Sequence, residues 1–193
     1  LFADPVGLPP QRELDHTIPL ILGAAPVNLR PYRYTLAQKD EIEKQVAEML
    51  RQGLIQNSCS SFAAPVLLVQ KKDLSWRFCI DFRRLNAITI KNRYPIPVIE
   101  ELLDELAGAC WFSKMDLRAG YHQIRLVLGD EFKTAFKTHM GHFQFKVMPY
   151  GLAYAPVTFM GNINNVLAPV NRKGVVVFMD DILVFTKTME QHR

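Results

Sequence analysis

The stretch VVVFMDDILVF, residues 175–185, contains two apolar runs that meet at a pair of acids. Both runs are rich in β-branched and aromatic residues and are too short for a typical helix, which predicts two buried strands. The connection, Phe178-Met179-Asp180-Asp181, lacks the Gly or Asn that two-residue hairpin turns usually need. The stretch therefore predicts a β-hairpin with a strained turn and carboxylates at its tip.

Two adjacent carboxylates in an apolar setting repel each other unless a cation neutralises them. Asp180 and Asp181 are therefore a candidate metal site, and an ordinary exposed acidic turn is the alternative. A third acid, Asp116, lies in the strand predicted for residues 111–117 and favours the metal site. In polymerases, hard oxygen ligands hold two magnesium ions about 4 Å apart for nucleotidyl transfer.

The composition is that of a globular protein, with 193 residues of which 49% are hydrophobic. This size fits one large domain or two small lobes. No apolar run approaches the roughly 18 residues that span a bilayer, and the chain does not start with a targeting pattern, so no membrane partner is expected. Because the sequence lacks an initiating Met, we expect a fragment of a longer chain. The three cysteines form no C-x-x-C and predict neither a disulfide framework nor a zinc site, which indicates a reducing compartment.

Basic residues are concentrated between residues 71 and 93. This segment contains seven basic and two acidic residues, so it carries more positive charge than the whole chain, whose net charge is +4. A basic segment beside an acidic site suits a polyanion held between them, and a charged solvated surface is the alternative. The basic residues are Lys71, Lys72, Arg77, Arg83, Arg84, Lys91 and Arg93.

The first half of the chain predicts an arm, a helix and a hairpin. Residues 1–35 contain six of the twelve prolines and predict an extended arm that docks on the body. After Thr35, Ile42, Val46, Met49 and Leu50 recur at helical spacing, and Gly53 follows as a stop signal. Residues 62–70 and 76–82 predict two strands joined by a turn.

The second half mixes helices with strands. Residues 94–97 predict a break, followed by a short amphipathic helix from Ile99 to about Gly108. His139 and His142 flank Gly141 in an H-x-x-H pattern, for which a polar hairpin turn is favoured over a metal pair. A helix is predicted over residues 155–167, with Pro156 in its first turn. This order of elements predicts an α+β fold with an antiparallel sheet packed on helices.

The sequence resembles the reverse transcriptases of gypsy-type (Metaviridae) long-terminal-repeat retrotransposons. The resemblance covers essentially the whole chain and rests on several ordered motifs. They are DHTIPL (15–20), RPYRY (30–34), WRFCIDFRRLN (76–86), FSKMDLRAGYHQI (112–124), TAF (134–136), MPYGL (148–152) and the hairpin at residues 175–185.

The resemblance implies a right-hand polymerase fragment that consists of the fingers and part of the palm. Residues 1–35 would form an extended N-terminal linker or arm, residues 36–93 the fingers and residues 94–193 the palm, with fingers and palm interleaved. The activity implied is RNA-directed DNA polymerisation, in which a primer 3′-hydroxyl attacks a dNTP. The remaining palm, the thumb, the connection and the RNase H domain would belong to the rest of a polyprotein, in an intracellular virus-like particle.

The resemblance also assigns roles to individual residues. The catalytic and metal-binding carboxylates are Asp116, Asp180 and Asp181, with Asp116 and Asp180 as the main magnesium ligands and Asp181 as the weaker assignment. They would hold two Mg²⁺ ions, for which Mn²⁺ is a substitute. The residues expected to contact the incoming dNTP are Lys71, Arg77, Ala119, Gly120, Tyr121 and Tyr150. Phe178 and Met179 are expected near the primer end of an RNA or DNA template with its primer.

Four positions depart from the family pattern. Leu74 stands where the family generally has Gly in the fingers turn, so a strained or rearranged turn is expected there. Tyr154 replaces a usual Asn. Gly161 in a helix interior costs about 1 kcal/mol, and Asn162 on a buried face costs about 1 to 3 kcal/mol if it is unpaired. We therefore expect a folded but destabilised domain. Because the rest of the palm and the thumb would be absent, we expect little processive polymerisation from this fragment. A noncatalytic nucleic-acid-binding module and an inactive, decayed relic are the alternatives. Dimerisation is open.

Overall fold

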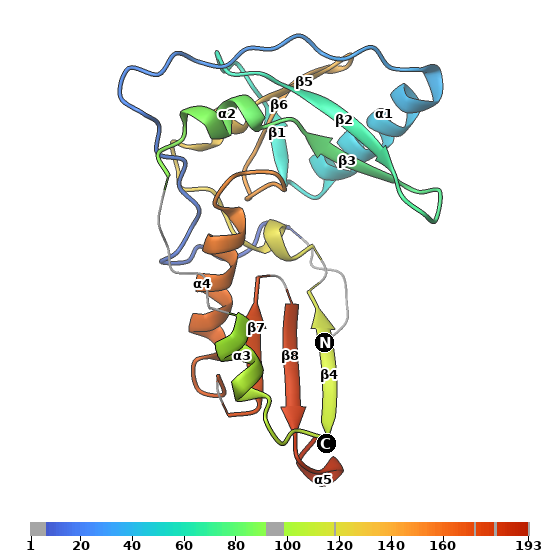
Figure 1. The fold of residues 1–193 in the computed structure, drawn as a ribbon. Coiled ribbons are helices and arrows are strands. Elements are labelled where there is room, and N and C mark those ends of the chain that lie inside the picture. Colours follow the sequence, from blue (N-terminus) through green and yellow to red (C-terminus); the bar gives the residue numbers. More distant parts are fainter. Residues whose placement is uncertain (1–6, 92–98, 118, 172, 180, 193) are drawn as a thin grey trace. The chain divides into compact units, whose positions relative to one another are not determined.

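The chain folds into two compact units, each with its own sheet and helices (Figure 1). The computed structural model describes residues 7–91, 99–117, 119–171, 173–179 and 181–192. The first unit contains Leu1–Lys91 and Tyr121–Ala155, and the second contains Asn92–Gly120 and Pro156–Arg193. The predicted α+β class is confirmed. The break predicted at residues 94–97 lies outside the described residues.

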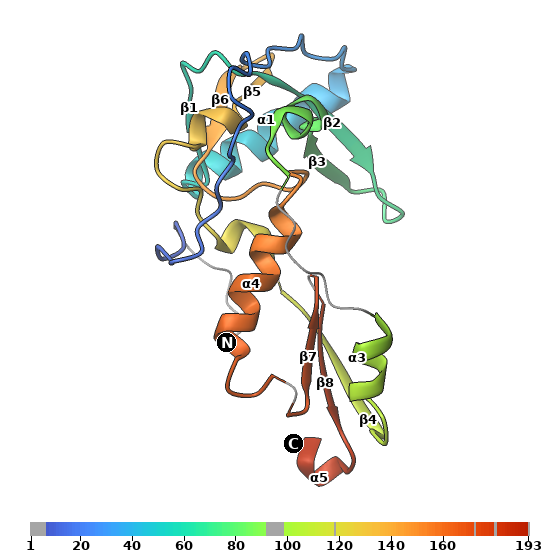
Figure 2. The ribbon, with the colours of Figure 1, turned by 60° about the vertical axis from the view of Figure 1, so that its left-hand side comes forward.

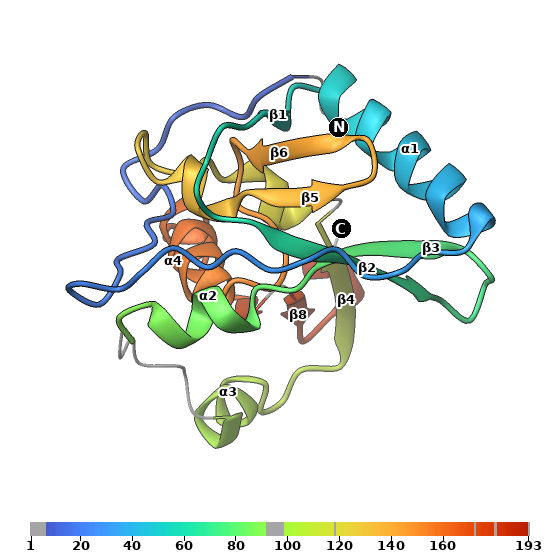
Figure 3. The same ribbon diagram turned by 90° about the horizontal axis from the view of Figure 1, so that it is seen from above.

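The sheet of the first unit has five strands in the order β1-β6-β5-β2-β3 (Figure 3). Its pairs are antiparallel except for β2 and β5, which run parallel with Ala64 opposite Phe136. The predicted antiparallel sheet therefore contains one parallel pair, between strands that are far apart in the sequence. The strands are β1 Ile55–Asn57, β2 Ala64–Gln70, β3 Trp76–Ile80, β5 Phe136–Thr138 and β6 Gly141–Phe145.

Helix α1, Leu36–Arg51, forms as its sequence predicts. Thr35 and Gln38 make a capping box that satisfies backbone N–H groups at its start. Ile42 and Val46 are fully buried, whereas Leu50 of the predicted apolar stripe is exposed. The helix contacts both edge strands, β1 and β3, so it crosses one face of the sheet. The remaining short helices are α2 Arg83–Ile88, η1 Gly120–Gln123 and η2 Glu131–Thr134.

The N-terminal arm docks on the first unit through backbone bonds and two buried side chains. His16 and Ile18 are each 2% exposed. The backbone N–H of Ile18 donates to Asp130 Oδ2 at 2.6 Å, and Lys133 Nζ donates to the carbonyl of Ile18 at 2.7 Å. Within the described residues 7–35 the chain forms isolated bridges but no helix or longer strand. The arm is extended, as predicted, and completes the core of this unit.

The turn between β2 and β3 is strained at Leu74. The two strands pair in register up to Gln70 and Trp76, which leaves residues 71–75 as the turn. Leu74 has φ +65° and a side chain that is 74% exposed, so it gains little packing in return for a left-handed backbone. The strain expected from the absence of Gly at this position is confirmed.

Replacing Leu74 by Gly is expected to stabilise the chain by about 0.5 to 1 kcal/mol, because Gly adopts positive φ without steric cost. For a chain of this length that gain corresponds to a rise in Tm of roughly 1 to 4 °C, measured by thermal unfolding. A Leu74→Ala variant is the matched control, since it removes the exposed side chain and keeps the Cβ. Equal melting temperatures for the Gly and Ala variants would argue against strain at this turn.

The second unit is built on the three-stranded sheet β4-β8-β7, with β8 in the centre. Both of its strand pairs are antiparallel. Helix α4, Ala155–Leu167, packs its Met160 against Val177 and Ile182 in a small apolar core. Helix α3, Ile99–Glu105, lies on the opposite face of the sheet (Figures 1 and 2). The other elements are β4 Trp111–Asp116, β7 Val175–Phe178, β8 Asp181–Thr186 and α5 Met189–His192.

Two sequence expectations for the helices of this unit are modified. Asn162 is buried on α4, but its amide donates to the carbonyl of Thr158 at 3.0 Å, so the cost of an unpaired amide does not arise. The apolar residues Ile99 and Leu103 of α3 are 56% and 60% exposed, so this predicted amphipathic helix buries little of its apolar face. Among the described residues, no helix has the length and apolar character needed to cross a membrane.

Candidate active site

The predicted acidic hairpin is present at one end of the second unit's sheet. Asp181 is the first residue of the central strand β8, and the strand register pairs it with Asp116 of β4 on one side and Phe178 of β7 on the other. Two of the three predicted carboxylate residues thus occupy directly opposite positions on neighbouring strands. The third, Asp180, lies outside the described residues.

The hairpin turn is strained, as its sequence predicts. Met179 has φ +54°, one of three positive values at non-glycine residues in the described part of the chain. Such conformations persist only where the surroundings hold them, and they concentrate at functional sites. Met179 is 38% exposed and Phe178 is partly buried, so the two residues predicted near a primer end border the acidic tip.

The ammonium group of Lys114 lies at the acidic tip. Lys114 Nζ lies 2.9 Å from Asp181 Oδ1, and the two side chains are 63% and 53% exposed. Because Ile182 packs toward α4, its neighbour Asp181 points to the opposite face of the sheet. The carboxylate of Asp181 is therefore accessible and attracts a cation.

The loop after β4 brings Ala119 and Gly120 into a tight turn. Ala119 has φ +49°, and the backbone N–H of Gly120 donates to the carbonyl of Leu117 at 3.1 Å. A Cβ at Gly120 would lie 2.9 Å from the ring of Phe159, so a larger residue there requires that ring to shift. The amide of Gly120, predicted to contact a phosphate, is already used within this turn.

The predicted phosphate-binding residues Lys71 and Arg77 both lie in the β2–β3 hairpin of the first unit. Arg77 pairs in register with Val69, and Lys71 opens the turn, where its backbone N–H donates to the carbonyl of Ser75. Both side chains are exposed, whereas Asp73 accepts hydrogen bonds from Ser75. These bonds lower the pKa of Asp73 and fix the turn. The hairpin therefore presents three cations to solvent, because Lys72 in the same turn is exposed as well.

One base of the predicted cluster is neutralised. Arg83 donates from Nε and from one terminal nitrogen to Asp81 at 2.8 and 2.7 Å, and the Tyr32 hydroxyl donates to the same carboxylate at 2.9 Å. These bonds hold the pKa of the buried Asp81 well below its usual range and raise that of Arg83. Arg83 thus serves the fold, and the basic surface is smaller than the sequence suggests.

Tyr121 and Tyr150, both predicted at the nucleotide pocket, contact each other in the first unit. Their ring centroids lie 4.6 Å apart in an edge-on arrangement, with Tyr121 9% and Tyr150 48% exposed. His122 packs between Tyr150 at 5.6 Å and Phe145 at 6.1 Å, and burial lowers its pKa to about 4. The sequence patterns did not single out His122, although it directly follows Tyr121 in the family motif.

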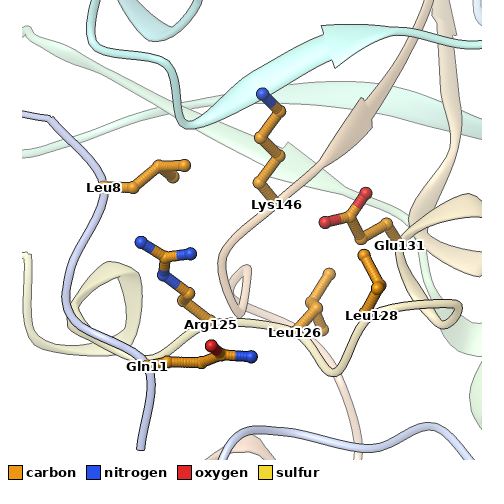
Figure 4. Close-up of a pocket in the computed structure, with 7 residues that line it drawn as sticks. All are labelled: Leu8, Gln11, Arg125, Leu126, Leu128, Glu131 and Lys146. Carbon is orange, nitrogen blue, oxygen red and sulfur yellow. The ribbon is translucent and has the colours of Figure 1, made fainter.

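Two other candidate sites do not match the catalytic residues. His139 pairs with Glu43 and His142 with the carbonyl of Phe62, so the H-x-x-H pattern serves a hairpin, as favoured. Across the described ranges, no three His, Cys, Asp or Glu side chains are grouped to hold a metal. A pocket of about 60 Å³ lies between the arm and Arg125, Glu131 and Lys146 (Figure 4). It is far smaller than the roughly 300 Å³ of typical ligand sites.

Comparison with known proteins decides the family. The profile described as "Reverse transcriptase (RNA-dependent DNA polymerase)" matches residues 69–193, more than half of the chain. The chain belongs to the reverse transcriptase family. The retrovirus-related Pol polyprotein from transposon 297 of Drosophila melanogaster is 41% identical over 173 residues, which are 87% of this chain and 16% of that polyprotein. This relationship confirms the resemblance to gypsy-type retrotransposon reverse transcriptases.

Two further similarities extend the comparison. An RNA-directed DNA polymerase homolog of Oenothera berteroana is 52% identical over 114 residues, or 59% of this chain and 80% of that protein. The foamy viral protease-reverse transcriptase, solved in complex with an RNA/DNA hybrid, superposes with a TM-score of 0.75 at 23% identity, over 94% of this chain and 24% of that chain. The predicted polymerase fold is thus confirmed. The chain spans only about a sixth of the transposon 297 polyprotein.

Reverse transcriptases generally use divalent metal ions. The residues of this reverse transcriptase suit such an ion, because Asp116 and Asp181 are hard oxygen donors at paired positions. The carboxylate of Asp181 already pairs with one cation, the ammonium of Lys114. Of the other predicted site residues, Lys71, Arg77, Tyr121 and Tyr150 belong to the first unit, and Ala119, Gly120, Phe178 and Met179 to the second.

Proposed function

We propose that the chain carries the catalytic centre of an RNA-directed DNA polymerase. The observation that supports this most is the register of β4 and β8, with Asp116 opposite Asp181 beside a strained hairpin turn in a member of the reverse transcriptase family. Asp116, Asp180 and Asp181 would hold two Mg²⁺ ions, with Mn²⁺ as a substitute. When bound, these ions activate the attacking hydroxyl and stabilise the leaving group.

The chain's own residues then bind and orient the substrates. Lys71 and Arg77 would grip the triphosphate of the dNTP, because exposed cations on a fixed hairpin match phosphate oxygens. Tyr121, held edge-on by Tyr150, would pack under the sugar and exclude a 2′-hydroxyl, which distinguishes ribonucleotides from deoxyribonucleotides. The backbone at Ala119 and Gly120 would border the phosphates. Phe178 and Met179 would contact the primer end.

The domain assignment follows from the same proposal. Residues 1–35 form the arm, residues 36–93 the fingers and residues 94–193 the palm. An RNA or DNA template with its primer is the partner, supported by the nucleic acid in the related foamy viral complex. The thumb, connection and RNase H domains would come from the rest of a polyprotein, as the length of the transposon 297 relative suggests.

Primer extension on poly(rA) with dTTP tests the proposal. We expect a longer polyprotein that includes these 193 residues to add nucleotides in Mg²⁺ or Mn²⁺ and to stop when EDTA is added, whereas the 193 residues alone make no long products. A noncatalytic binding module would instead show salt-sensitive binding of primer-template without incorporation. A relic would neither unfold cooperatively nor bind. Either of these last outcomes would overturn the proposal.

A further inference from the structure

The ion pair between Lys114 and Asp181 lies at the proposed metal site and is not needed by the fold. Its two side chains are 63% and 53% exposed and meet at 2.9 Å. Exposed pairs of this kind contribute little to stability, because water and salt screen them. The strand pairing of β4 and β8 already fixes the backbone on both sides. The pair therefore contributes little to the stability of the fold.

The position of Lys114 on β4 instead favours a role at the acidic tip. It lies two residues before Asp116 on β4, opposite Leu183, and reaches along the sheet to Asp181 at the tip of the neighbouring strand. Asp116 and Asp181 occupy paired register positions at this tip, and like charges at close range repel each other unless a cation lies near them. The ammonium supplies that cation in the absence of metal.

We propose that Lys114 is a positioning residue. Its ammonium group stays paired with Asp181 at the proposed metal site until a divalent cation displaces it. This inference rests on the proposed function, since it assumes that Asp116 and Asp181 bind metal. A divalent cation that binds Asp181 then has to break the ion pair. Its positive charge also lies close to the ammonium of Lys114, which repels it. Both effects weaken metal binding, so Lys114 sets the metal affinity below the value that the carboxylates alone would give.

Direct titration with Mn²⁺ measures the effect without relying on polymerase activity. The 193-residue chain is titrated and free Mn²⁺ is followed by electron paramagnetic resonance. We expect Lys114→Met to bind Mn²⁺ roughly two- to fivefold more tightly than the parent, the range expected from an exposed ion pair. Lys114→Arg should bind like the parent, because it keeps the cation. Circular dichroism checks that each variant folds.

Two controls separate the local effect from a change in net charge. Lys187→Met removes the same charge just after the far end of β8, about 20 Å along the strand from Asp181, and should leave the affinity unchanged. In an Asp181→Asn background, Lys114→Met should tighten binding less than it does in the parent, since the ion pair with Asp181 is gone. Equal tightening in both lysine variants, or tightening of undiminished size in the Asp181→Asn background, would overturn the inference.

The outcomes also separate this inference from the proposed function. Saturable Mn²⁺ binding that is lost in Asp116→Asn but unchanged in Lys114→Met leaves the metal site in place and overturns only the role of Lys114. Absence of saturable binding in the parent and in Lys114→Met overturns both. Binding that appears or tightens only in Lys114→Met and depends on Asp181 supports the displacement.

Discussion

Replacing Asp116 by Asn is expected to slow nucleotide incorporation by roughly a thousandfold or more. A metal ion contributes several kcal/mol to the transition state of phosphoryl transfer, and each 1.4 kcal/mol corresponds to a factor of ten in rate. An amide is nearly the same size as a carboxylate but carries no charge, so the fold should survive while the affinity for metal falls. Single-turnover incorporation of one dNTP by a longer polyprotein that includes these residues measures the loss.

The matched control is Asp104→Asn, which removes one exposed carboxylate from α3 in the same unit. It should incorporate nucleotides at the parental rate. The unfolding transition of both variants should match that of the parent, because Asp116 lies at the end of its strand. Incorporation by Asp116→Asn within tenfold of the parent would contradict the assignment of Asp116 as a metal ligand.

Acidification from pH 7 to pH 5 is expected to destabilise the first unit by about 2 kcal/mol for each of two histidines, the buried His16 and the partly buried His122. Burial lowers the pKa of His16 to about 4, against a smaller opposing effect of Asp130, and burial lowers that of His122 to about 4 as well. The unfolded chain takes up these protons near pH 6.5, whereas the folded chain does so near pH 4. Stability is therefore retained above pH 6.5 and is lost as the pH falls toward 4.

Urea unfolding at pH 7 and pH 5 measures this loss. His16→Gln keeps a polar side chain of similar size that does not titrate, so the difference in stability between the two pH values should be about 2 kcal/mol smaller than in the parent. His122→Gln should show the same reduction. A parental pH dependence in either variant would mean that the histidine replaced is not the group that titrates.

Local patterns in the sequence predict much of this fold. The helix predicted over residues 155–167 has the observed bounds of α4, and the hairpin around Asp180 and Asp181 pairs as expected. The strain at Leu74 and Met179 also follows from sequence, because each stands where a turn normally requires Gly or Asn. Periodicity and turn chemistry depend on neighbouring residues alone and can be read without knowing the fold.

What the sequence did not predict involves residues that are far apart. The parallel pairing of β2 with β5 and the hydrogen bond from Tyr32 to Asp81 depend on where the chain returns. At the candidate site, family motifs identify the acids, but Lys114 stands out only once the register brings β4 beside β8. A lysine in a strand gives no sign of its partner until the neighbouring strand is known.

The docked arm has a consequence for how this domain is divided. The family match begins at residue 69, within β2, yet α1, β1 and the buried His16 and Ile18 all precede it. A chain started at the match would expose the apolar surfaces that these segments cover and would cut a strand in two. The segment that the family profile matches is thus shorter than the segment that folds, and expression boundaries should follow the second.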